Sequence, residues 1–103
     1  MSQDLTIGGP GGSITVTAGT LEQLVVGAAE SVDGARVHRR VRRRLEVEID
    51  GREARVELEL RIRYGLVLPD VAREAQERVA DALRAMCGVD RAVVDVSVEE
   101  LEE

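Results

Sequence analysis

Several residue types are scarce or missing in this chain of 103 residues, and each absence excludes a class of protein. Lysine is absent and all 14 basic residues are arginines, which excludes a P-loop lysine, a lysine Schiff base and lysine-linked biotinyl or lipoyl groups. His38 and Cys87 are the single histidine and cysteine, so the chain alone cannot build a common zinc site or an internal disulfide. We therefore expect a non-enzymatic protein with no cofactor, metal site or catalytic residue.

Long hydrophobic runs are absent as well. The longest strongly apolar stretch, Leu24 to Ala29, is far shorter than the roughly 20 residues needed to span a bilayer. Residues 1–12 lack the charged and apolar regions of a signal peptide. The net charge of -6 opposes a general attraction to nucleic acid. We expect a cytoplasmic protein without a direct membrane span.

The residues that are present suffice for one domain. An apolar fraction of 44% supports one ordinary core, and 103 residues leave no room for a second. Residues 1–12 hold four glycines around Pro10, so we expect a flexible, glycine-rich leader; a phosphate-binding loop is disfavoured because the Gly-Lys-Ser/Thr ending is missing. Residues 13–98 should form a single α+β domain and residues 99–103 an acidic tail.

Hydrophobic periodicity predicts the element order β-α-β-β-α-β. A capping box at Thr20 and Gln23 should open the first helix, while Pro69 in the first turn and Gly88 after the last one delimit the second. We expect two layers, with both helices on one face of a small, largely antiparallel sheet in ferredoxin-like or related strand order. The predicted elements are a strand at 13–17, a helix at 21–32, a hairpin at 41–64, a helix at 68–87 and a strand at 94–98.

The hairpin carries the most detailed prediction. Apolar residues occupy odd positions before Asp50-Gly51 and even positions after it, and this dipeptide is typical of a type I′ turn. A two-residue loop there pairs positions whose numbers sum to 101, so Leu45 should face Val56. The opposite, solvated face should then carry ladder ion pairs. These predicted pairs are Glu46 with Arg55, Arg44 with Glu57, and Arg42 with Glu59.

The second half of the domain contains short motifs in a characteristic order. They are Tyr64-Gly65, Leu68-Pro69-Asp70-Val71-Ala72, Gln76, Val79, Met86-Cys87-Gly88-Val89 and Val94-Asp95-Val96-Ser97-Val98. Across residues 14–98 the chain resembles the alkaline shock protein family of bacterial envelope-stress and general stress proteins. The resemblance implies structural roles for Tyr64, Gly65, Pro69, Gln76, Met86 and Gly88. It also implies a non-enzymatic role, with some members held at the membrane by a separate integral-membrane protein.

A basic segment is the strongest local anomaly, because six of the 14 arginines and the only histidine lie within residues 36–44. Arg42 and Arg44 have predicted glutamate partners. The candidate partner-binding residues are therefore Arg36, His38, Arg39, Arg40 and Arg43. They could bind an acidic protein, an anionic lipid headgroup or phosphate, and the alternative is a solvated strand end.

These observations and the resemblance together predict a function in cell-envelope stress or homeostasis. We expect protein-protein interaction, either self-association into a homo-oligomer or recruitment to a membrane-anchored partner at the inner face of the cell membrane. Two alternatives stay open: a nucleic-acid-binding module that uses the segment from Arg36 to Arg44, and a small ligand-binding protein with a closed polar pocket. Cys87 is expected to be structural, and His38 a surface residue.

Overall fold

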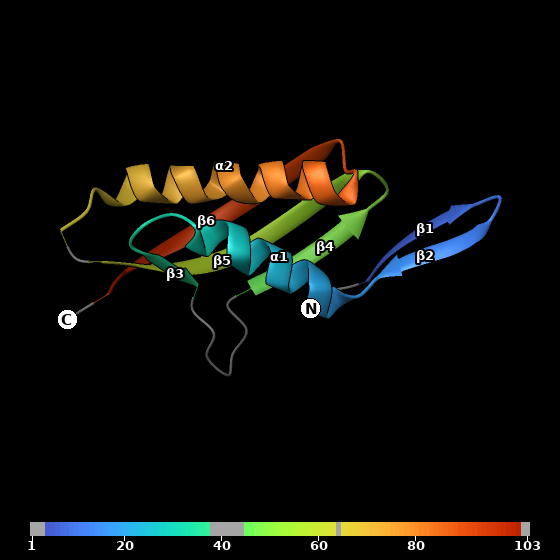
Figure 1. Ribbon diagram of the computed structural model, residues 1–103. Helices are drawn as coiled ribbons and strands as arrows, with labels where there is room; N and C mark the ends of the chain where they lie inside the picture. The colour runs from blue at the N-terminus through green and yellow to red at the C-terminus, as the bar shows by residue number, and fades with distance from the viewer. Residues whose placement is uncertain (1–3, 38–44, 64, 102–103) are drawn as a thin grey trace.

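The computed structural model describes residues 4–37, 45–63 and 65–101, and its helices lie on one face of the main sheet (Figure 1). This arrangement confirms the predicted two-layer α+β fold. The elements are β1 (Leu5–Gly9), β2 (Gly12–Val16), α1 (Ala18–Glu30), β3 (Ala35–Val37), β4 (Leu45–Asp50), β5 (Glu53–Arg63), α2 (Leu68–Cys87) and β6 (Arg91–Leu101).

Strand β5 is the centre of the main sheet. β6 runs parallel to it along its full length, whereas β3 and β4 are antiparallel and share its other edge. Leu60 of β5 pairs with Val37 of β3, and Leu58 of β5 pairs with Leu45 of β4. β3 and β4 therefore lie end to end along this edge, on either side of the position of Glu59. β5, α2 and β6 form a β-α-β unit of adjacent strands, and the strand order is therefore related to the split ferredoxin-like one rather than identical to it.

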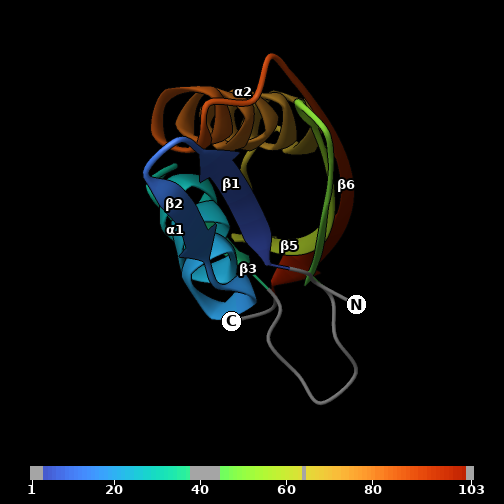
Figure 2. The ribbon, with the colours of Figure 1, turned by 90° about the vertical axis from the view of Figure 1, so that its right-hand side faces the viewer.

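The core lies between the sheet and the two helices. Even-numbered residues of β5, including Val56, Leu60 and Ile62, are buried in this core. The layer of α1 and α2 lies on one side of the main sheet (Figure 2). Leu21 of α1 and Leu83 of α2 are fully buried in the same cluster. No charged side chain is buried among the residues that the structure describes. Alternation along β5 thus separates an apolar helix-facing side from a charged outer side.

The N-terminal segment differs from the expected leader. Residues 5–16 form an antiparallel hairpin, here called the arm, in which Leu5 pairs with Val16 and Pro10-Gly11 lies at the tip. The arm projects beyond the rest of the protein, and the strand predicted at 13–17 is outside the main sheet (Figure 1). The neglected signal was the alternation of Leu5 and Ile7 before a Pro-Gly turn.

Helix α1 begins earlier than predicted. Its N-cap is Thr17 rather than Thr20, because the Thr17 hydroxyl accepts a hydrogen bond from the Thr20 backbone N–H at 3.3 Å. Asp4 at the base of the arm also accepts a 2.7 Å hydrogen bond from the Ala18 N–H. The helix ends at Glu30, and Gly34, with a φ of 89°, follows in the turn into β3.

The predicted register of the β4–β5 hairpin is wrong by two residues. Paired positions sum to 103, so Leu45 lies opposite Leu58 and the loop is Gly51-Arg52. A type I′ turn needs positive φ at both loop residues, and Arg52 does not have one. The Arg52 carbonyl instead accepts the N–H groups of Asp90 and Arg91 at 2.7 and 3.2 Å. A register shift of two residues leaves each side chain on the same face of the sheet. The predicted buried face of the hairpin is therefore confirmed.

The C-terminal half follows the prediction more closely. α2 begins at Leu68 with Pro69 in its first turn, and Gly88 ends it in the left-handed conformation at φ 71°. β6 is longer than predicted, because residues 99–101 of the expected acidic tail pair with β5 up to Arg63. None of the helices in the described ranges is long and apolar enough to cross a membrane.

Candidate interaction surface

The face of the main sheet that points away from the helices is here called the open face. Odd-numbered residues of β5 supply its centre, with neighbours from β4 and β6. In the described part of the chain both helices lie on the other face of these strands, and no further helix or strand covers the open face (Figure 1). The open face is therefore a regular surface that the fold can present to a partner.

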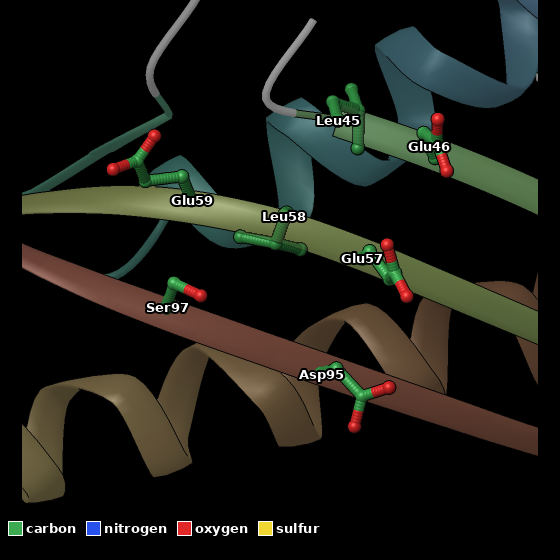
Figure 3. A pocket seen from close by; sticks show the side chains of 7 residues that line it. All are labelled: Leu45, Glu46, Glu57, Leu58, Glu59, Asp95 and Ser97. Carbon is green, nitrogen blue, oxygen red and sulfur yellow. The ribbon is translucent and has the colours of Figure 1, made fainter. Parts of the chain in front are cut away.

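Three carboxylates line up across the middle of the open face. Glu46 of β4 lies opposite Glu57 of β5, and Glu57 lies beside Asp95 of β6. Their side chains form one line across the three strands, here called the acidic row (Figure 3). Like charges directly opposite each other destabilise a sheet, so this arrangement opposes folding.

A shallow depression of about 450 Å³ surrounds the acidic row. Leu45 and Leu58 line it along the strands, although the Leu58 side chain is buried in the core, while Glu59 and Ser97 continue the polar side one step along the strands (Figure 3). The depression opens to solvent between flat strands, unlike the closed polar pocket that a small-ligand protein would need. Its shape suits an extended or flat partner better than a small molecule.

The ends of the sheet carry opposite charges in pairs, in contrast to its middle. Arg61 lies 3.5 Å from Glu99, and Arg91 lies 3.8 Å from Glu53. Among the described residues, neither Glu57 nor Asp95 has an ion pair. Exposed pairs contribute little to stability, but they neutralise the ends of the sheet. Glu57 and Asp95 therefore leave negative charge in the middle of the open face for a partner.

The predicted partner-binding cluster is described only at Arg36. This exposed residue lies on β3 opposite Arg61, and its Nη1 donates a 2.8 Å hydrogen bond to the Ala35 carbonyl. His38, Arg39, Arg40 and Arg43 lie outside the described residues, as do Arg42 and Arg44. Partner binding by the cluster stays a prediction. The described pairing does not support the predicted ion pair of Glu46 with Arg55, because Arg55 lies opposite Glu48.

The motif residues that the structure describes have mainly structural positions. Gly65 and Gly88 take positive φ angles of 99° and 71°, and Pro69 lies in the first turn of α2. The Gln76 Nε2 donates a 2.6 Å hydrogen bond to the Val94 carbonyl of β6. Met86, for which the resemblance implies a structural role, is 71% exposed in the last turn of the helix. Tyr64 lies outside the described residues.

Cys87 is half-buried at the end of α2. Burial raises the pKa of its thiol above the ordinary value, because the charged thiolate loses hydration. The helix C-terminus also disfavours a negative charge. These conditions favour the neutral thiol and agree with a structural role.

Sequence reasoning missed the acidic row because the predicted register paired its glutamates with arginines. The detectable signal was the glycine at position 51, which can occupy the first loop position and leave Asp50 in the strand. With that register, Glu46 and Glu57 fall opposite each other. The contribution of Asp95 depended on the parallel pairing of β5 and β6, which the sequence pattern did not specify.

The chain is similar to a known protein family and to solved structures. The model of the alkaline shock protein family, described as having a cell envelope-related function, matches residues 9–102. A cysteine-to-serine variant of the MamM CTD is 22% identical with a TM-score of 0.57, over 82% of this chain and 96% of that chain. The nickel form of another MamM CTD variant is 21% identical with a TM-score of 0.57, over 82% and 99%. The similarities to these solved structures concern the fold alone, and no curated protein matches.

Proposed function

Because the chain belongs to the alkaline shock protein family, whose function is related to the cell envelope, we propose that it is a non-enzymatic envelope-homeostasis protein. It acts by binding other proteins, through self-association or through recruitment to a membrane-anchored partner at the inner face of the cell membrane. The observation that carries this proposal is the family match over residues 9–102, almost the whole chain. The match confirms the family that the sequence motifs indicated.

The open face is the surface that we assign to the partner. Within the acidic row, Glu57 and Asp95 lie side by side without an ion pair among the described residues, and their repulsion costs stability in the isolated protein. A basic segment of a partner would relieve this repulsion on binding, and complementary charge would also accelerate association. The row therefore supports recognition of a protein that presents arginine or lysine side chains.

The acidic row also argues against the nucleic-acid alternative. Phosphate groups would be repelled from the middle of the sheet, where RNA-binding proteins of similar architecture stack bases on aromatic residues. Tyr64 is the sole aromatic residue of the chain. The proposal of a protein partner thus has more support than that of a nucleic acid.

Co-isolation from cells tests the proposal. Tagged wild-type chain, expressed at native abundance with membranes solubilised, should retain an integral-membrane protein. The double variant Glu57→Gln/Asp95→Asn should retain several-fold less of it, because two charges of the acidic row are removed. Glu22→Gln/Asp70→Asn is the matched control, since it removes two charges from the helix layer outside both the acidic row and the groove between α2 and β6. Equal retention by both double variants would contradict the role of the row, and no envelope protein above an untagged control would contradict the proposed function.

A further inference from the structure

The arm is unusual in composition as well as in position. Residues 5–21 contain no charged side chain, although 33% of the chain is charged. Ile7 and Ile14 lie directly opposite each other on the arm and are 45% and 64% exposed. Leu5 at the base is buried in the core, so apolar exposure increases towards the tip. The arm is thus anchored at one end and presents a bare apolar pair at the other.

An isolated two-stranded hairpin is only marginally stable in water. In the described residues β1 and β2 pair only with each other, so both outer edges of the arm have unpaired backbone groups. A charge-free segment can also be desolvated without the cost of burying an ion. These properties favour an arm that docks onto another surface through its apolar pair and a strand edge.

A complementary strand edge lies on β6. Asp50 and Glu53 flank the two-residue loop as a hydrogen-bonded pair, so the N–H and C=O groups of odd-numbered β5 residues point towards β4. Because these directions alternate along a strand, the N–H and C=O groups of even-numbered β5 residues point towards β6. In the parallel ladder, peptide groups of even-numbered β6 residues then point away from β5. The hydrogen bond from Gln76 to the Val94 carbonyl agrees with this orientation. Beyond Val94, the peptide groups of Val96 and Val98 lie on a free edge, since β5 is the one described partner of β6.

A groove of about 680 Å³ runs between α2 and β6 beside this edge. Ala80, Ala92 and Val94 supply its apolar part, and charged residues of both signs, among them Asp81 and Arg84, form its rim. Val96 and Val98 are half-buried and continue the apolar side of β6 along the strand. The groove thus offers apolar contact next to unpaired backbone groups.

We propose that the arm of one copy adds to the free edge of β6 in a second copy, with Ile7 and Ile14 against the groove. This inference rests on the self-association in the proposed function and names its interface. The neutral arm fits a rim that already carries both signs of charge. Pairing of β6 with β6 of another copy fits less well, because Asp95 and Glu99 of each copy would meet on one face.

Mixed disulfide trapping tests this contact in the Cys87→Ser background. Two single-cysteine variants, Ile14→Cys and Val96→Cys, are mixed under mild oxidation and analysed by intact mass. The mixed disulfide should predominate, because adjacent strands place such side chains within bonding distance. Thr15→Cys, on the opposite side of the arm, is the matched control and should form several-fold less of it. Disulfides between two Val96→Cys chains alone, or none at all, would overturn the proposal.

Sedimentation velocity with surface variants gives a second test. Val96→Pro removes an N–H that points away from β5, and Ile14→Asp charges the arm; each should weaken self-association at least tenfold while circular dichroism stays native. Val67→Asp charges another exposed apolar residue and should leave association unchanged. A monomeric wild type, or association unaffected by Ile14→Asp, would overturn the arm contact. Co-isolation of an envelope partner would then still support the proposed function, so the two failures are distinguishable.

Discussion

At the scale of single residues, Glu57 occupies the most unfavourable position on the open face, between Glu46 and Asp95. Glu57→Gln should raise the free energy of unfolding by about 0.2–1 kcal/mol, because it removes both like-charge contacts. Urea denaturation at low salt measures the change, which should shrink as salt screens the wild-type repulsion. Glu53→Gln is the control. Glu53 lies 3.8 Å from Arg91, so removing its charge should not stabilise the folded protein. A lower stability of Glu57→Gln would contradict the repulsion.

Leu58 tests the buried face of the hairpin. Its side chain is 3% exposed against the helices, so Leu58→Ala should lower the free energy of unfolding by about 2–5 kcal/mol through lost burial and a residual cavity. Val67→Ala, at a residue that is 61% exposed, should change stability little. Chemical denaturation of both variants measures the difference. Similar losses in the two would mean that Leu58 does not pack in the core.

Cys87 links stability to alkaline pH. Its pKa is raised in the folded protein by burial, so the folded state holds the thiol proton more tightly than the unfolded state. This contribution to stability is complete below the unfolded thiol pKa and is lost as pH rises through the folded pKa. Wild-type stability should therefore fall more steeply than that of Cys87→Ala above about pH 9. Parallel pH profiles of urea denaturation would refute this prediction.

Among the secondary-structure elements, α1 has two candidate N-cap residues, Thr17 and Thr20, which mutation can distinguish. Thr17→Ala should lower the free energy of unfolding by about 1 kcal/mol, because its hydroxyl accepts the Thr20 N–H. Thr20→Ala should lower the free energy of unfolding clearly less, since the backbone N–H of residue 20 still donates to the Thr17 hydroxyl. Thermal and urea denaturation compare the two variants. A larger loss for Thr20→Ala would assign the cap to the residue that the sequence pattern favoured.

The arm is the element whose role depends most on its surroundings. Within one copy it is a hairpin anchored by Leu5 and by the hydrogen bond from Ala18 to Asp4. Its tip consists of glycines around Pro10, and a Cβ added at Gly8, Gly9, Gly11 or Gly12 would meet no atom. Of these four glycines, Gly12 has a positive φ of 124°, so the turn of the hairpin favours glycine at that position.

At the scale of the whole molecule, the two proposed surfaces differ in their response to salt. The contact between arm and β6 is apolar and uses backbone hydrogen bonds, so self-association should persist at about 1 M salt. Binding of a basic partner to the acidic row should weaken steeply over the same range. Sedimentation velocity measures the first effect, and co-isolation at increasing salt the second. Dissociation of the oligomer by salt would assign self-association to charged groups instead of the arm.

Features that depend on local periodicity could be predicted from the amino-acid pattern alone. Helix α2 could be delimited because Pro69 and Gly88 act on their own backbone and the apolar stripe repeats with the helical period. The buried face of the β4–β5 hairpin could also be predicted, since alternation survives a shift of two residues. The same alternation indicated a charged open face.

Which residues meet across strands depends instead on how the elements pack in three dimensions. The register of β4 and β5 depends on the φ angles at Gly51-Arg52, and the alignment of Asp95 with Glu57 depends on a parallel pairing over a long crossover. Neither is encoded in the pattern of one strand. The acidic row, the free edge of β6 and the groove beside α2 therefore emerged from packing, because each combines elements that are distant in sequence.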